Sequence, residues 1–99
     1  MNMQQMMIQA QKMQRELQRM KDELAQKEFS VSKNGAVTVV VMGDKSIKCI
    51  DIEKDALEPD NKEMIEELIA LAINEALSQI NEAEEAINSK LTGGMGGLF

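Results

Sequence analysis

Between Met3 and Leu24 the apolar side chains recur alternately three and four residues apart. This is the spacing of a heptad seam, and the Gln, Lys, Arg and Glu residues between the seam positions favour a helix. A helix with so narrow an apolar stripe is not stable alone in water, so we expect residues 2–27 to form a helix that lies against another helix. The seam consists of Met3, Met6, Ala10, Met13, Leu17, Met20 and Leu24.

After residue 28 the period changes from helical to two, which predicts strands at 29–33, 36–42 and 46–52. Asn34-Gly35 between the first two strands is typical of a type I′ hairpin turn. The run AVTVVVM is dense in β-branched residues and predicts a central strand covered on both faces. Strict alternation along the third strand places Ile47, Cys49 and Asp51 on one face and Lys48, Ile50 and Ile52 on the other. These strands form a three-strand antiparallel meander.

A second long helix is expected over residues 61–90, with Asp60 as its N-cap and Glu63 in capping-box relation to it. The glycine-rich residues 92–99 are expected to form a flexible tail. The order of the expected elements therefore predicts that residues 1–91 form a single α+β domain of the type α-β-β-β-α. One helix leaves part of the sheet uncovered, and the first helix has no evident partner, so we expect a homodimer.

Several function classes find little support in the composition. The chain has no His and one Cys, and no glycine-rich phosphate loop joins a strand to a helix. Cys49 is expected to be a small core residue, and the carboxylates of the second helix a solvated face. We therefore predict no enzyme, no metal site, no other cofactor and no small-molecule substrate. The first residues do not resemble a signal peptide and no apolar run spans a bilayer, which predicts a cytoplasmic protein without a membrane partner.

The net charge of −6 is unevenly distributed. Residues 1–28 carry five basic and four acidic side chains, and residues 29–52 carry three and two, so each segment has a charge of +1. Residues 53–99 carry three basic and eleven acidic side chains, which gives −8. A polyanion would therefore meet the first half of the chain. Lys12, Arg15 and Arg19 lie on the helix face opposite the seam and are candidates for such contact; the alternative is an ordinary solvated face.

Four stretches of the sequence together resemble the YbaB/EbfC family of bacterial nucleoid-associated proteins. They are MQQMMIQAQKMQRELQRMKDEL, the hairpin with GAVTVVVMGD, the run from IDIEKDALEPD to INEAL, and the TGGMGG tail. The resemblance implies the fold α-β-β-β-α and a tweezer-shaped homodimer with projecting helical arms. It also implies binding to double-stranded DNA at the nucleoid with little sequence preference. Carried over to this chain, the phosphate contacts are Lys12, Arg15 and Arg19, with Lys21 and Lys27 behind them.

A second interpretation remains open. The methionines of the first helix, including Met6, Met7 and Met13, are adaptable side chains that suit a protein-binding groove. In that case the chain is a coiled-coil adaptor or a prefoldin-like holdase without DNA affinity. Such an activity would depend little on salt concentration.

Overall fold

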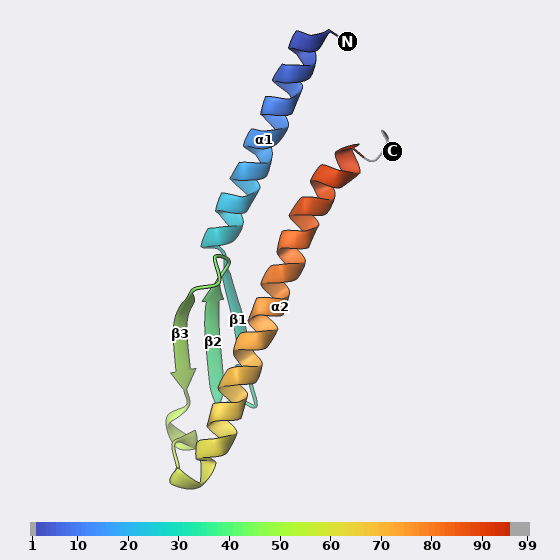
Figure 1. Cartoon of the computed structure of the whole chain (residues 1–99). Coiled ribbons are helices and arrows are strands. Elements are labelled where there is room, and N and C mark those ends of the chain that lie inside the picture. Colours follow the sequence, from blue (N-terminus) through green and yellow to red (C-terminus); the bar gives the residue numbers. More distant parts are fainter. Residues whose placement is uncertain (1, 96–99) are drawn as a thin grey trace.

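The computed structural model describes residues 2–95, and the side chains of residues 2–90. Two long helices flank three strands and two short 3-10 turns, so the predicted α+β fold with the order α-β-β-β-α is confirmed (Figure 1). The elements are α1 (Met3–Gln26), β1 (Glu28–Lys33), β2 (Val37–Met42), β3 (Ile47–Ile52), η1 (Lys54–Ala56), η2 (Pro59–Asn61) and α2 (Lys62–Met95).

The molecule is a rod with dimensions of 70 × 23 × 14 Å, and its two ends differ in construction. At one end α2 lies across the sheet; at the other α2 runs antiparallel beside α1 (Figure 1). We call the first part the sheet end and the second the arm. The side chain of Asn2 caps α1 by accepting a hydrogen bond from the amide of Gln5 at 2.8 Å.

The sheet is an antiparallel meander in the order β1-β2-β3. Asn34 and Gly35 connect β1 to β2 with φ values of 55° and 64°, and the amide of Ala36 donates to the carbonyl of Lys33 at 3.0 Å. Positive φ at both central residues is what a type I′ turn requires, so the predicted hairpin is confirmed.

The core lies between α2 and one face of the sheet. Val37, Val39 and Val41 of β2 are at most 1% exposed, and they face Ala72, Ala76 and Ile80 of α2, which are completely buried. The prediction that β2 is covered on both faces is wrong for the single chain. Its other side chains, Thr38, Val40 and Met42, are half-buried because α2 lies on one face only.

A β-bulge makes the predicted assignment of β3 side chains to the two faces of the sheet wrong. Val40 pairs with Cys49 but Val41 pairs with Ile47, so Lys48 is an extra residue in β3. The bulge reverses the alternation, and Ile47, Ile50 and Ile52 therefore share the face of their partners Val41, Val39 and Val37. Cys49 lies on the opposite face and is exposed, so its prediction as a core residue is wrong.

Both ends of α2 differ from the expectation. Asp60 is not its N-cap, because Pro59–Asn61 form a separate 3-10 turn and α2 begins at Lys62. The side chain of Asn61 stabilises this entry by donating to the carbonyl of Ala56 at 3.1 Å. The helix continues to Met95 instead of ending near residue 90, so residues 92–95 of the predicted tail are helical. Residues 96–99 lie outside the described part of the chain.

Candidate nucleic-acid interface

The seam of α1 divides into a lower and an upper part. Met13, Leu17, Met20 and Leu24 are half-buried, whereas Met3, Met6 and Ala10 are exposed. Met13, Glu16, Leu17 and Met20 line one small depression together with Ile87 and Lys90 of α2. The second helix of the same chain therefore covers the lower seam, and Met3 and Met6 remain 81% and 57% exposed at the tip.

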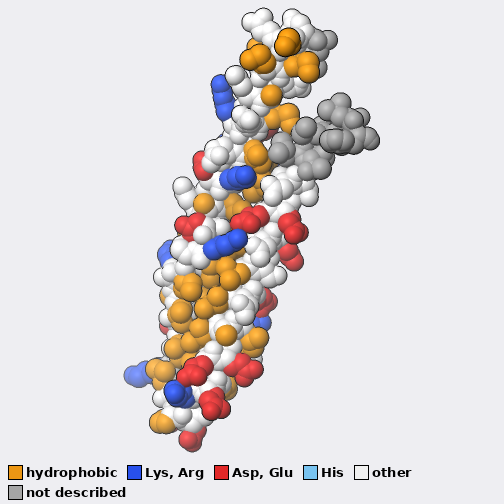
Figure 2. Space-filling view, in the orientation of Figure 1, with side chains coloured by type: hydrophobic (Ala, Val, Ile, Leu, Met, Phe, Trp, Pro, Cys, Tyr) orange, Lys and Arg blue, Asp and Glu red, His pale blue; other side chains and the backbone are white. Residues whose placement is uncertain are grey.

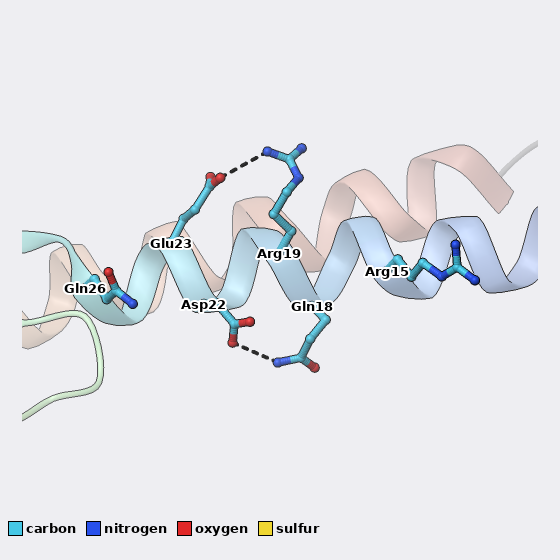
Figure 3. Close-up of a pocket in the computed structure, with 6 residues that line it drawn as sticks. All are labelled: Arg15, Gln18, Arg19, Asp22, Glu23 and Gln26. Carbon is cyan, nitrogen blue, oxygen red and sulfur yellow. Dashed lines mark hydrogen bonds and ion pairs between the residues drawn. The ribbon is translucent and has the colours of Figure 1, made fainter.

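The outer face of α1 carries the predicted trio Lys12, Arg15 and Arg19, all of them exposed. Positions three and four residues apart lie on one face of a helix, and the trio spans about 10 Å at 1.5 Å per residue. Figure 3 shows Arg15 lying along the near side of α1 and Arg19 rising from it, with the α2 ribbon behind α1. These guanidinium groups are thus positioned by a rigid backbone and face solvent.

Two interactions within α1 occupy part of this face. The Nη1 atom of Arg19 lies 3.0 Å from the carboxylate of Glu23, and the amide of Gln18 donates to Asp22 at 2.9 Å (Figure 3). The Arg19 and Glu23 side chains are 60% and 65% exposed. An exposed i,i+4 ion pair contributes only about 0.3–0.5 kcal/mol, so a phosphate can replace the carboxylate at small cost.

Lys21 and Lys27, the other two predicted contacts, lie elsewhere. Lys21 borders a depression between α1, α2 and the β2–β3 turn, beside Asp44 and Glu84. The Lys27 amine lies 5.4 Å from the centre of the Phe29 ring, at the base of the arm. The structure therefore places three of the five basic residues on one outward face and the other two away from it.

The upper arm holds basic residues and no acidic ones. Residues 3–15 of α1 and 86–95 of α2 include Lys12, Arg15 and Lys90, and neither segment contains Asp or Glu. Figure 2 shows basic and acidic side chains interspersed along the lower part of the arm, and further acidic side chains at the opposite end of the rod. Sequence reasoning left Lys90 as an isolated charge, because only the antiparallel return of α2 beside α1 brings it near Met13.

No chemistry beyond charge is evident in the described residues. Residues 2–95 contain no group of three or more His, Cys, Asp or Glu side chains arranged to hold a metal ion. The two groups with perturbed pKa values lie outside the basic face: hydrogen bonds from Ser46 lower the pKa of Asp44, and Glu28 raises the pKa of Lys48. Within the described residues, neither helix has the length and apolarity needed to cross a membrane.

The comparisons with known proteins agree on one family. Residues 1–95 match the model of the YbaB/EbfC DNA-binding family. A nucleoid-associated protein of Acetivibrio thermocellus is 46% identical over 98 residues, which cover 98% of this chain and 87% of the relative. Nucleoid-associated proteins of Clostridium novyi and Mycoplasmopsis pulmonis are 46% and 38% identical, over 100% and 95% of this chain and 90% and 93% of the relatives.

Proposed function

This chain belongs to the YbaB/EbfC DNA-binding family, and from that premise we propose that it is a nucleoid-associated protein that binds duplex DNA as a homodimer. The outer face of the arm meets the phosphate backbone through Lys12, Arg15 and Arg19, and the protein reads little or no base sequence. Lys90 adds a further positive charge at the upper arm.

The observation that carries this proposal is the separation of charge along the rod. The whole chain has a net charge of −6, which by itself opposes DNA binding. Residues 3–15 of α1 and 86–95 of α2 nevertheless include three cations and no carboxylate; Glu16 and Glu85 border them, and the other acidic residues of α2 lie further toward the sheet end. Because salt screens charges separated by more than about 8–10 Å, DNA at the upper arm is screened from the acidic sheet end and responds mainly to the charges of the arm itself.

A homodimer strengthens this interaction because it presents two arms to one duplex. Three phosphate contacts from a single arm give weak binding. Once the first arm is bound, the second arm binds as an intramolecular event at high effective concentration. Flexible lysine and arginine contacts of this kind bind backbone rather than base edges.

The test is a titration of fluorescent duplex DNA at several salt concentrations, followed by anisotropy. The variant Lys12→Gln/Arg15→Gln/Arg19→Gln removes three charges from the arm, and Lys33→Gln/Lys45→Gln/Lys54→Gln removes three from the sheet end. For six phosphate contacts per dimer, the arm variant lowers the slope of log K against log salt by about 5. The sheet-end variant keeps the wild-type slope. Equal losses in both variants would contradict a binding site on the arm.

One observation favours a second candidate function, the capture of another protein. Met3, Met6, Met7 and Ile8 are 57–81% exposed at the tip of the arm. Polar replacement by Met6→Gln/Met7→Gln leaves DNA affinity unchanged if DNA is the ligand. If the arm is a holdase, the same change abolishes suppression of aggregation of a model client such as heated citrate synthase, whereas wild type suppresses it at any salt concentration.

A further inference from the structure

The methionines of this chain are concentrated in α1. Five of the nine Met residues lie within residues 3–20, and two of these five, Met13 and Met20, are half-buried in the seam. Among the described residues, the eleven buried side chains that form the core of the sheet end are Phe, Val, Ala, Ile and Leu, with no Met. The two regions are therefore held together by different side chains: the sheet end by hydrocarbon alone, and the arm partly by thioether sulfur.

Met13 and Met20 lie where the two helices of the arm meet. They are seven residues apart, so they lie on the same side of α1. Together with Ile87 and Lys90 of α2 they border a depression of about 80 Å³, and Leu17 lies between them in the same seam. Because α1 contains no buried residue, half-buried contacts of this kind are what join α1 to α2.

The two seam methionines are open to small molecules and still have structural contacts to lose. Half-burial leaves one side of each thioether in reach of solvent. Met3, Met6 and Met7 are 57–81% exposed at the tip of the arm, where Figure 2 shows apolar side chains gathered. A polar group added at the tip would enter water, whereas the same group added at Met13 or Met20 would enter the contact between the helices.

Hydrogen peroxide adds such a polar group to methionine. The sulfur lone pair attacks one peroxide oxygen, the O–O bond breaks, and an S–O bond forms. The sulfur loses two electrons, and the departing hydroxide takes up the remaining proton as water. The product, methionine sulfoxide, is polar and disrupts Met-rich contacts, because burial removes its hydration.

We propose that Met13 and Met20 are oxidation sites through which peroxide loosens the arm and lowers DNA affinity. The second part rests on the proposed function, since the basic face of Lys12, Arg15 and Arg19 belongs to the same helix. A helix with the narrow apolar stripe of α1 is not stable alone in water, so losing its contact with α2 costs the basic face its fixed position. Methionine sulfoxide reductases return sulfoxide to thioether, so the change is reversible.

The first experiment treats the full chain with hydrogen peroxide and then with dithiothreitol. Peroxide leaves Lys and Arg intact, and dithiothreitol returns the exposed Cys49 to the thiol while the sulfoxides remain. Mass spectrometry locates the added oxygen atoms. The amides of residues 13–20 are expected to exchange hydrogen about tenfold faster, because two polar groups now lie in the seam, and the β2 amides at their former rate. Unchanged rates at residues 13–20 after oxidation of both seam methionines overturn the proposal.

A matched pair of variants assigns the effect to the seam. Met13→Leu/Met20→Leu and Met3→Leu/Met6→Leu each remove two thioethers, and Leu preserves both volume and helix propensity. After peroxide the seam variant keeps the slow exchange and the DNA affinity of the untreated protein. The tip variant loses both, as the wild type does. Equal sensitivity of the two variants to peroxide shows that the proposal is wrong.

A second pair of variants needs no oxidant. Met13→Gln/Met20→Gln places uncharged polar side chains in the seam and should lower DNA affinity about twofold for each arm, because apparent affinity follows the fraction of arms in the binding-competent form. Met6→Gln/Met7→Gln places the same groups at the tip and keeps the wild-type affinity. Equal affinities of the two variants contradict the proposal.

This inference and the proposed function fail separately. If Lys12→Gln/Arg15→Gln/Arg19→Gln binds DNA as the wild type does, the proposed function is wrong, while the exchange rates still decide whether oxidation loosens the arm. If DNA affinity depends on these three charges but not on oxidation of Met13 and Met20, the proposed function stands and the regulation inferred here is refuted.

Discussion

The sheet end and the arm differ in what holds them together. At the sheet end, eleven apolar side chains are 8% exposed or less, whereas α1 contains no buried residue. The arm is a pair of helices that contact each other along one half-buried seam, and its outer face carries exposed charged side chains. Most of the buried core therefore lies in one region and the proposed binding surface in another, so changes in the two regions should have separable effects.

Under the proposed function, the same division lets a protein of net negative charge bind DNA. The acidic residues of η1, η2 and the first half of α2 lie at the sheet end, whereas Glu16, Glu84 and Glu85 lie at the border of the upper arm. Net charge is a property of the whole chain, but a polyanion responds to charges within about a Debye length. The charge of one region is therefore a better guide to binding than the charge of the chain.

The largest expected difference between the two regions is in stability. Ile80→Ala removes a completely buried side chain from the sheet end and should lower the free energy of unfolding by about 2–5 kcal/mol. Leu17→Ala removes a half-buried seam residue from the arm and should cost about 1 kcal/mol. Urea unfolding followed by circular dichroism, at one protein concentration, measures both. Equal costs would show that the arm and the sheet end form one cooperative core.

Much of this architecture follows from local patterns in the sequence. The heptad spacing of α1, the Asn34-Gly35 turn and the β-branched run of β2 each depend on neighbouring residues, and each element is present within a residue or two of its expected bounds. The bulge at Lys48 could not be predicted in this way. Its position follows from the pairing of β3 with β2, and it changes which side chains of β3 face α2.

Only part of the candidate site could be predicted from the sequence. Helical spacing alone places Lys12, Arg15 and Arg19 on one outward face, as the structure has them. The position of Lys90 depends on α2 returning beside α1, which is a tertiary feature. The distinction between Lys21 and the trio likewise requires knowledge of which side of α1 meets α2.

The junction between the two regions provides a second prediction. The amide of Gly43 donates to the carbonyl of Lys27 at 2.9 Å, and a Cβ at Gly43 would overlap the carbonyl oxygen of Leu24. Gly43→Ala must therefore displace the base of α1, at a cost of about 1–3 kcal/mol. Hydrogen exchange should accelerate at residues 24–27, and urea unfolding gives the energy.

Gly35→Ala is the matched control, because Gly35 has a positive φ of 64° and open space around its Cβ position. It should cost about 1–2 kcal/mol through backbone strain, without faster exchange at the base of α1. If both variants accelerate exchange there equally, the close approach at Gly43 is not what fixes the arm to the sheet.

A third, smaller effect concerns the charge of the arm itself. Glu23→Gln removes the carboxylate that pairs with Arg19 at 3.0 Å and leaves the guanidinium free for phosphate. At about 0.3–0.5 kcal/mol per arm and two arms per dimer, DNA affinity should rise about three- to fivefold in the anisotropy titration. Glu75→Gln makes the same change in net charge at the sheet end, beside Lys33, and should leave the affinity unchanged. Equal gains would mean that only the net charge matters.

The smallest effect lies in the turn between β2 and β3, which touches both regions through Gly43. The side chain and backbone of Ser46 donate hydrogen bonds to the Asp44 carboxylate and lower its pKa below the ordinary value of 3.8. A lowered pKa means that the folded state favours the ionised form, so the stabilisation is present above pH 3.8 and is lost as the pH falls through the lowered value. The difference in unfolding free energy between wild type and Asp44→Asn should therefore be largest near pH 6 and shrink below pH 3.8.

Because all other carboxylates are common to both proteins, their titration cancels in this difference. A difference that stays constant from pH 6 to pH 2.5 would show that the substituted amide forms the same hydrogen bonds and that the charge of Asp44 contributes nothing to the turn.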